Sequence, residues 1–296
     1  DLPPTPEQLE TLLQDCDGAI TLLTDSIGGP LFDRLPKLRV VSNFAVGFDN
    51  IDVPAATARG VLVCNTPDVL TAATADATWS LLLAAARRIP EAQQYVRDGH
   101  WKTWSPLLLL GQEVTGATIG IVGLGRIGKE VAKRARGFAM RILAFDPYED
   151  PAFAKEYGVA YVPLDKLLSD SDFVTLHVAL TPETQHLIGP DQLKRMKSTA
   201  ILVNASRGPV IVTDALVAAL QNGDILAAAL DVTDPEPLPA EHPLVHMPNC
   251  IVVPHTASAT VQTRDRMADL AARNLLAGLR GERPPASVNA DDVLEQ

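Results

Sequence analysis

The chain has 296 residues, of which 47% are hydrophobic and 21% are charged, and its formal net charge is −11. This composition is typical of a well-packed globular protein and excludes a disordered chain, while the length predicts two domains. The acidic balance argues against nucleic acid or an anionic membrane as a partner, although it leaves room for a local basic pocket that binds a small anion.

Targeting signals and cysteine usage indicate the cellular compartment of such a chain. It begins with acidic and proline-rich residues 1–4, without the basic start of a secretory signal, and no apolar run approaches the roughly 18–20 residues of a membrane span. Cys16, Cys64 and Cys250 are too few and too widely spaced for a disulfide framework or a metal site. We therefore expect a cytoplasmic protein with no metal.

The first part of the chain alternates apolar runs with helical stretches. Strands are predicted at 19–23, 38–42 and 61–64, and helices at 6–15 and 54–59. Alternation of this kind is typical of a parallel sheet covered by helices.

A longer helical segment follows, from about residue 72 to residue 88, and leads into a second helix that ends near Gly99. A helix between two alternating blocks is a plausible connector of domains. The run of leucines at 107–110 is far too short to span a membrane, so we interpret it as a packed loop or a contact arm.

The second block continues the alternation and closes with a helix at 261–280 that is long enough to return to the first domain. We therefore predict an α/β fold of two Rossmann-like, doubly wound parallel-sheet domains with a cleft between them. The strands predicted in this block lie at 117–122, 142–145, 161–162, 173–177, 200–204, 228–232 and 250–253.

Three glycines lie between a strand pattern and a helix pattern in this block. Gly123 allows a tight turn, Gly125 lets the backbone approach a pyrophosphate, and Gly128 lets helix and strand pack closely. The N-terminus of the helix offers N–H groups and the positive end of its dipole to a diphosphate. With strand, helix and a following acid in register, the motif predicts a dinucleotide site.

The following acid is Asp146, which ends the next apolar run about 20 residues further on. Its carboxylate is suited to accept hydrogen bonds from the adenosine ribose and to repel a 2′-phosphate. Residues 147–150 contain no arginine or lysine that would offset this repulsion. We therefore predict NAD as the cofactor in preference to NADP.

Arg207, Glu236 and His255 are the candidates for chemistry. Reduction of a 2-keto acid needs a proton for the carbonyl oxygen, which a histidine supplies near neutral pH. A carboxylate beside the histidine holds its tautomer, and an arginine grips the substrate carboxylate. Spacing alone leaves open a surface arginine, a solvated glutamate and a capped strand end. We interpret the other histidines as surface or loop residues: His100, His177, His186, His242 and His246.

Longer motifs show that the chain resembles the D-isomer-specific 2-hydroxyacid dehydrogenase family over essentially its whole length. The motifs that carry the resemblance lie at 46–52, 65–70, 204–208, 230–237 and 254–259. Within the family the chain is most similar to glyoxylate/hydroxypyruvate reductases, through residues 99–107, 231–239 and 274–282.

The resemblance implies a role for each candidate. Arg207 binds the substrate carboxylate together with the backbone of Val46 and Gly47, His255 is the acid/base, and Glu236 orients His255. Eight residues match positions that contact the cofactor in the family: Thr74, Arg126, Ile127, Asp146, Val178, Ala205, Asp231 and Ala257. Of these, Asp231 would hold the nicotinamide carboxamide.

The resemblance also implies the organisation of the domains. Residues 1–75 and 266–296 form a discontinuous, flavodoxin-like substrate-binding domain, and residues 76–265 form an NAD-binding Rossmann domain. An arm near residues 101–110 reaches across a homodimer. Val212 and the pair Thr256–Ala257 depart from the residues that are usual in the family.

The leading hypothesis is an enzyme that reduces glyoxylate or hydroxypyruvate with NADH. A second reading keeps the fold and changes the substrate to phosphite or a larger 2-keto acid, although relatives that oxidise phosphite carry a lysine where Val46 stands. A third is an NADH-sensing corepressor-like binding protein, which needs a peptide-binding groove that no sequence feature indicates.

Overall fold

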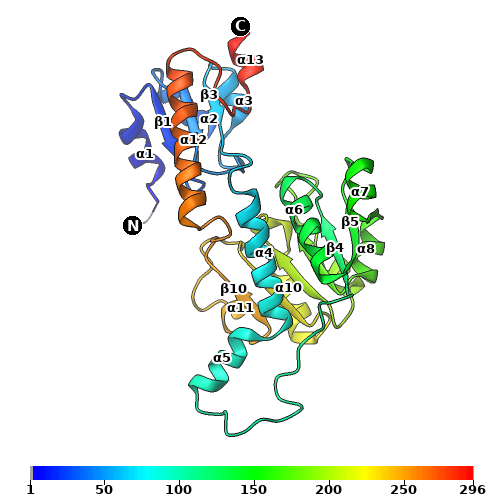
Figure 1. Cartoon of the computed structure of the whole chain (residues 1–296). Helices are drawn as coiled ribbons and strands as arrows, with labels where there is room; N and C mark the ends of the chain where they lie inside the picture. The colour runs from blue at the N-terminus through cyan, green and yellow to red at the C-terminus, as the bar shows by residue number, and fades with distance from the viewer. Residues whose placement is uncertain (1–2, 296) are drawn as a thin grey trace. The chain divides into compact units, whose positions relative to one another are not determined.

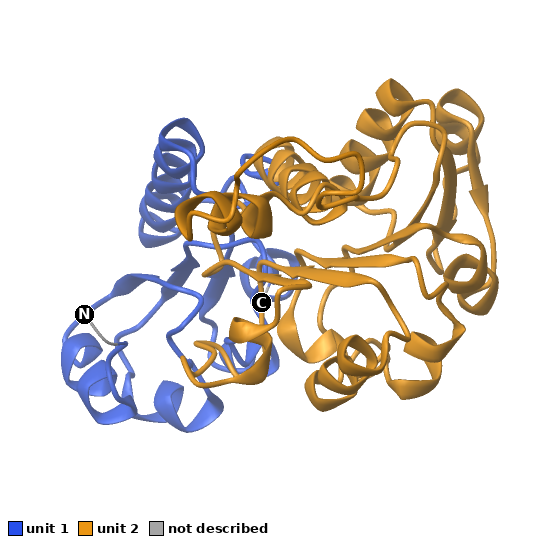
Figure 2. Ribbon diagram, turned by 90° about the horizontal axis from the view of Figure 1, so that it is seen from below, with its two compact units in different colours: residues 1–70, 259–296 blue, residues 71–258 orange. Residues whose placement is uncertain are grey.

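The computed structural model describes residues 3–295 of the chain. The chain divides into two compact units, residues 1–70 with 259–296, and residues 71–258 (Figure 2). Within the described part of the chain, every helix is too short or too polar to cross a bilayer.

The first unit is built on a three-stranded parallel sheet in the order β1-β2-β3. Helix α12 contacts all three strands (Figure 1), and it approaches so closely that a Cβ on Gly278 would lie 2.6 Å from Val40. The elements of this unit are α1 (Pro6–Leu13), β1 (Gly18–Thr21), α2 (Gly29–Arg34), β2 (Val40–Asn43), α3 (Val53–Thr57), β3 (Leu62–Cys64), α12 (Val261–Leu279) and α13 (Ala290–Leu294).

The second unit is built on a seven-stranded parallel sheet in the order β10-β9-β8-β7-β4-β5-β6. The chain runs from β4 outward to β6 and then returns to place β7 on the other side of β4. Ligands of open parallel sheets bind at the carboxyl ends of the strands beside such a reversal. The strands are β4 (Thr118–Val122), β5 (Arg141–Phe145), β6 (Val159–Tyr161), β7 (Phe173–Leu176), β8 (Ile201–Asn204), β9 (Ala227–Leu230) and β10 (Cys250–Val252).

Helices cover both faces of this sheet, so its central strands are buried on both sides, as is usual for parallel sheets. Phe173 of β7 packs in the core beneath α4 and α6, while its neighbour Val174 packs in the core beneath α8, α9 and α10. The helices of this unit are α4 (Thr71–Ala86), α5 (Ile89–Arg97), α6 (Arg126–Ala135), α7 (Pro151–Tyr157), α8 (Leu164–Asp170), α9 (Pro190–Arg195), α10 (Thr213–Asn222) and α11 (Pro243–His246).

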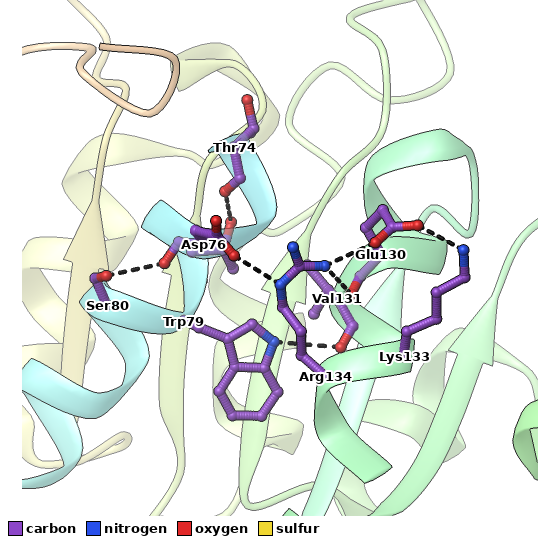
Figure 3. Close-up of polar contacts among 9 residues, drawn as sticks. Thr74, Asp76, Trp79, Ser80, Glu130, Val131, Lys133 and Arg134 are labelled. Atoms are coloured by element: carbon purple, nitrogen blue, oxygen red, sulfur yellow. Dashed lines mark hydrogen bonds and ion pairs between the residues drawn. The ribbon is translucent and has the colours of Figure 1, made fainter. Parts of the chain in front are cut away.

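Helix α6, which follows the glycine-rich loop, is fixed against α4 by polar contacts as well as by packing (Figure 3). The Trp79 indole N–H donates to the carbonyl of Val131 at 3.2 Å. The Arg134 guanidinium joins Asp76 of α4 to Glu130 of α6, each at 2.8 Å. The N-terminus of α6 is therefore held in a defined position at the carboxyl ends of the strands.

The predicted α/β class with parallel sheets is confirmed. Each predicted strand is present, although the strand expected at 161–162 runs over Val159–Tyr161. The connecting helix expected at 72–88 is α4, and the second helix, expected to end near Gly99, is α5.

Candidate active site

The glycine-rich loop joins the end of β4 to the start of α6. Gly123 has a φ of +91°, and a Cβ there would lie 2.8 Å from the backbone of His177. A Cβ on Gly128 would lie 2.1 Å from the carbonyl oxygen of Gly123. These contacts leave no room for any side chain at either position, as the tight turn and close packing predicted for them require.

Gly125 is different, because a Cβ placed on it would meet no atom within 4 Å. It is also the N-cap of α6, and it provides no side-chain hydrogen bond to the first turn of that helix. The open space in front of a helix N-terminus that lacks a side-chain cap suits a diphosphate, which needs close approach to backbone N–H groups. The loop therefore fits the dinucleotide that the sequence predicts.

Asp146 follows β5 and is tied to the same loop. Its Oδ2 accepts a hydrogen bond from the N–H of Leu124 at 2.7 Å, and its Oδ1 accepts one from the N–H of Tyr148 at 2.8 Å. These bonds fix the carboxylate beside the start of α6. Its oxygens keep lone pairs that can accept hydrogen bonds from further donors.

A nearby cation was missed when residues 147–150 were considered alone. Lys129 of α6 places its Nζ 2.6 Å from Asp150 Oδ2. The one sequence signal is that Lys129 lies about one helical turn after Gly125, so both residues lie on the same side of α6. The pairing with Asp150 depends on tertiary structure and has no signature in the sequence.

The three candidate residues for chemistry follow three neighbouring strands. Arg207 comes after β8, Glu236 after β9 and His255 after β10, and these strands are adjacent in the sheet. Parallel strands end at one edge of a sheet, so residues far apart in the sequence meet there. His255 Nδ1 lies 2.7 Å from Glu236 Oε1.

The backbone brings the first two of these loops into direct contact. A Cβ on Gly208 would lie 1.9 Å from the carbonyl oxygen of Thr233, so only glycine allows this approach. The N–H of Thr233 donates to Glu236 Oε2 at 3.2 Å, and the side chain of Asn204 donates to the carbonyl of Arg207 at 2.9 Å. The backbone that carries each of these two candidate side chains is therefore anchored.

Asp231 anchors the loop that carries His255. Its buried carboxylate accepts hydrogen bonds from the N–H groups of Thr256 at 2.6 Å and Ala257 at 3.1 Å, and its carbonyl accepts one from the N–H of His255 at 2.9 Å. His255 itself has a φ of +51°, a left-handed conformation that a non-glycine residue adopts only where its surroundings impose it. The anchored turn fixes the direction of the imidazole.

The charge state of Glu236 follows from its neighbours. Burial raises the pKa of Glu236, but the hydrogen bond and charge of His255, the N–H of Thr233 and the charge of Arg207 outweigh it, so the pKa is lowered overall. The carboxylate is therefore ionised near neutral pH and accepts a hydrogen bond from the N–H at His255 Nδ1. This leaves His255 Nε2 as the nitrogen that exchanges a proton with another molecule.

His177 is not the ordinary loop residue that the sequence suggested. It follows β7 beside Gly123, its Nε2 lies 2.8 Å from Thr175 Oγ1, and its buried Nδ1 has no hydrogen-bond partner among residues 3–295. Burial lowers the pKa of His177 to about 3, so the ring is neutral. The one sequence signal is strand alternation, which places His177 on the same face as buried Phe173.

The other predicted positions are also located. In the second unit, Thr74 is buried in α4, Arg126 and Ile127 begin α6, Val178 follows β7, and Ala205 follows β8. Val46 and Gly47 belong to the first unit, in the loop after β2.

A glycine-rich loop beside the reversal of a parallel sheet, with a histidine–carboxylate pair at neighbouring strand ends, defines a nicotinamide-dependent dehydrogenase. The NAD binding domain of D-isomer specific 2-hydroxyacid dehydrogenases matches residues 79–257. The chain belongs to the D-isomer specific 2-hydroxyacid dehydrogenase family, which confirms the resemblance.

Individual members of the family are similar to the chain over most of its length. The chain is 54% identical to a glyoxylate reductase of Korarchaeum cryptofilum, over 98% of this chain and 88% of that protein. An NADPH-dependent glyoxylate/hydroxypyruvate reductase of Sinorhizobium meliloti, solved with NADP and malonate, is 35% identical, with a TM-score of 0.87 over 98% of this chain and 88% of its own. A D-lactate dehydrogenase of Aquifex aeolicus, solved with NAD and lactic acid, is 28% identical, with a TM-score of 0.84 over 92% and 86%.

Gly125→Ala tests the cofactor loop. The open space around Gly125 predicts an unchanged melting temperature, while the added methyl group obstructs the diphosphate and weakens NADH binding by about tenfold, or roughly 1.4 kcal/mol. Fluorescence titration with NADH measures the affinity. Gly137→Ala is the matched control, because its Cβ also meets no atom within 4 Å. Unchanged NADH affinity in Gly125→Ala contradicts the assignment of the loop.

Proposed function

We propose that the protein reduces a small 2-keto acid, glyoxylate or hydroxypyruvate, to the 2-hydroxy acid with NADH. The observation that carries the proposal is the 2.7 Å contact between His255 and Glu236, beside the strand end that bears Arg207. The likeness to glyoxylate reductases over nearly the whole chain supports this choice of substrate.

Each catalytic residue has a role that its surroundings support. His255 donates the proton to the carbonyl oxygen from Nε2, because Nδ1 is engaged by Glu236. Glu236 stabilises the protonated imidazole and holds its orientation. Arg207 binds the substrate carboxylate, as do the backbone N–H groups of Val46 and Gly47. Bound NADH supplies the hydride for the carbonyl carbon.

We propose NAD(H) as the preferred cofactor. The Asp146 carboxylate beside the start of α6 is placed to accept ribose hydroxyls and to repel a 2′-phosphate. Lys129 does not offset this repulsion, because its charge is paired with Asp150. The residues proposed to contact the cofactor are Thr74, Gly123, Gly125, Arg126, Ile127, Gly128, Asp146, Val178, Ala205, Asp231 and Ala257.

We also propose that the protein is a homodimer that pairs through the cofactor-binding unit, with its arm, residues 101–110, reaching across to the partner. The arm exposes Trp104 by 78% and Leu107 by 77%, which is a large apolar area for a solvent-facing loop. Beside the base of the arm lies a cavity of about 550 Å³ that Leu110, Leu226 and Ile251 help to line. A second copy that covers the arm would remove this apolar surface from water.

A cytoplasmic location is part of the proposal. Cys16, Cys64 and Cys250 are all unpaired, as expected in a reducing compartment. Burial raises the pKa of Cys64 to about 11 and that of Cys250 to about 12, so both thiols are protonated and unreactive at neutral pH.

His255→Ala tests the catalytic assignment. Without the proton donor, the rate of NADH oxidation with glyoxylate or hydroxypyruvate should fall by about 10²–10⁴, while NADH binding persists. Absorbance at the nicotinamide band follows turnover. His246→Ala, which loses one surface hydrogen bond to Ala240, should keep full activity. If the wild type binds NADH tightly and turns over neither acid, nor pyruvate, nor phosphite with NAD, the sensor hypothesis replaces the enzyme.

Asp146→Ala tests the cofactor preference. Removing the charge that opposes a 2′-phosphate should lower the ratio of kcat/KM for NADH to that for NADPH by about tenfold. The exposed neighbour Glu149→Ala is the control and should leave the ratio unchanged. A wild type that prefers NADPH would show that Asp146 does not set the choice.

The double variant Trp104→Ala, Leu107→Ala tests the arm. Loss of both apolar side chains should convert the dimer to a monomer at micromolar concentration, measured by light scattering after gel filtration, while the far-ultraviolet spectrum is unchanged. Tyr148→Ala is the control, because this side chain is 87% exposed but lies outside the arm. A monomeric wild type contradicts the dimer proposal.

A further inference from the structure

The loop that follows β2 in the first unit has an unusual pattern of hydrogen bonds. The carbonyl groups of residues 45–48 are all held, two by backbone N–H groups and two by asparagine side chains. Thr66 N–H donates to the carbonyl of Ala45 at 2.8 Å, and Ile51 N–H donates to that of Phe48 at 3.0 Å. The loop is therefore pinned at every peptide rather than at its ends alone.

The two asparagines hold the middle of the loop. Asn65 Nδ2 donates to the carbonyl of Val46 at 2.8 Å, and Asn43 Nδ2 donates to that of Gly47 at 2.9 Å. Asn43 is fully buried, and its Oδ1 accepts the Thr21 hydroxyl at 3.1 Å. Asn43 is the last residue of β2, and Asn65 directly follows β3.

Asn65 is itself anchored from a distant part of the sequence. Its carbonyl accepts a hydrogen bond from the side chain of Asn274, a buried residue of α12, at 2.9 Å. Asn274 Oδ1 in turn accepts the N–H of Ala286 at 2.9 Å. The position of the Asn65 backbone is thus fixed by the helix that returns to this unit.

Because the peptide bond is planar, a hydrogen bond that fixes a carbonyl group also fixes the direction of the N–H group in the same peptide. In a trans peptide the C=O of one residue and the N–H of the next point in opposite directions. Asn65, by holding the carbonyl of Val46, sets the direction of the Gly47 N–H, and Thr66 does the same for the Val46 N–H. Among residues 3–295, neither of these N–H groups has a hydrogen-bond acceptor.

We propose that Asn65 is a positioning residue for substrate: its amide aims the Gly47 N–H at the carboxylate of the 2-keto acid. The inference rests on the proposed function, in which the backbone of Val46 and Gly47 binds that carboxylate. An N–H donor fixed in advance needs no reorganisation when the anion arrives, which favours binding. Asn65 touches neither substrate nor cofactor in this role and acts through one peptide group.

Asn65→Ala is the test. Loss of the amide releases the Val46–Gly47 peptide, so KM for glyoxylate and the inhibition constant of oxamate, a non-reacting carboxylate analogue, should both rise by about tenfold. The KM for NADH should stay within about twofold, because the cofactor loop belongs to the other unit. Asn65→Asp, which keeps the size but turns an oxygen toward the Val46 carbonyl, should raise both constants further.

Asn249→Ala is the matched control. Asn249 is also half-buried and also donates from its side chain to backbone carbonyls, those of Leu220 and Leu226, but it precedes β10 at the amino end of the strand. All three constants should match the wild type. The comparison separates loss of an asparagine bond to the backbone from loss of this particular one.

The outcomes are distinct. Raised glyoxylate and oxamate constants with an unchanged KM for NADH support the proposal. Unchanged constants in Asn65→Ala overturn it, and a matching rise in KM for NADH also overturns it, because general disruption would then be the cause. A wild type that turns over neither glyoxylate nor hydroxypyruvate overturns the proposed function first and this inference with it.

Discussion

The contact between His255 and Glu236 depends on how closely neighbouring backbones approach at the carboxyl edge of the sheet. Glu236 belongs to the loop that touches Gly208, where any side chain would collide with Thr233. His255 belongs to a turn that hangs from the buried carboxylate of Asp231. A hydrogen bond of 2.7 Å between side chains on two loops survives only if both loops are fixed to within a few tenths of an ångström, and buried backbone contacts supply that rigidity.

The three glycines of the predicted cofactor loop in the same unit differ in what surrounds them. Gly123 and Gly128 are required by contacts inside the protein, so they shape the loop whether or not a ligand is bound. Gly125 has no such contact, and its lack of a side chain has a physical purpose only if another molecule comes close. The backbone of His177 lies against Gly123, and the buried ring of this histidine is neutral.

Sequence patterns were sufficient for what is local. Buried strands of a parallel sheet are continuous apolar runs, so their positions and the α/β class were predictable, and the glycine motif with its acid was predictable because all its parts lie within one βαβ unit. Contacts across the fold were not. The ion pair of Lys129 with Asp150 and the burial of His177 arise when separate segments pack together, and no spacing in the chain encodes them.

The two groups proposed for the substrate carboxylate illustrate the same distinction. Arg207 can be predicted from the sequence, because a guanidinium after a strand end is a chemical group that binds carboxylates. A backbone N–H group is common to every non-proline residue. The directions of the Val46 and Gly47 N–H groups are set by donors elsewhere, the Thr66 N–H on the carbonyl of Ala45 and the Asn65 amide on the carbonyl of Val46. In the role proposed for it, Asn65 therefore acts on binding through the backbone of a neighbouring loop. Its effect passes through one rigid peptide plane, which is why only the three-dimensional structure makes it visible.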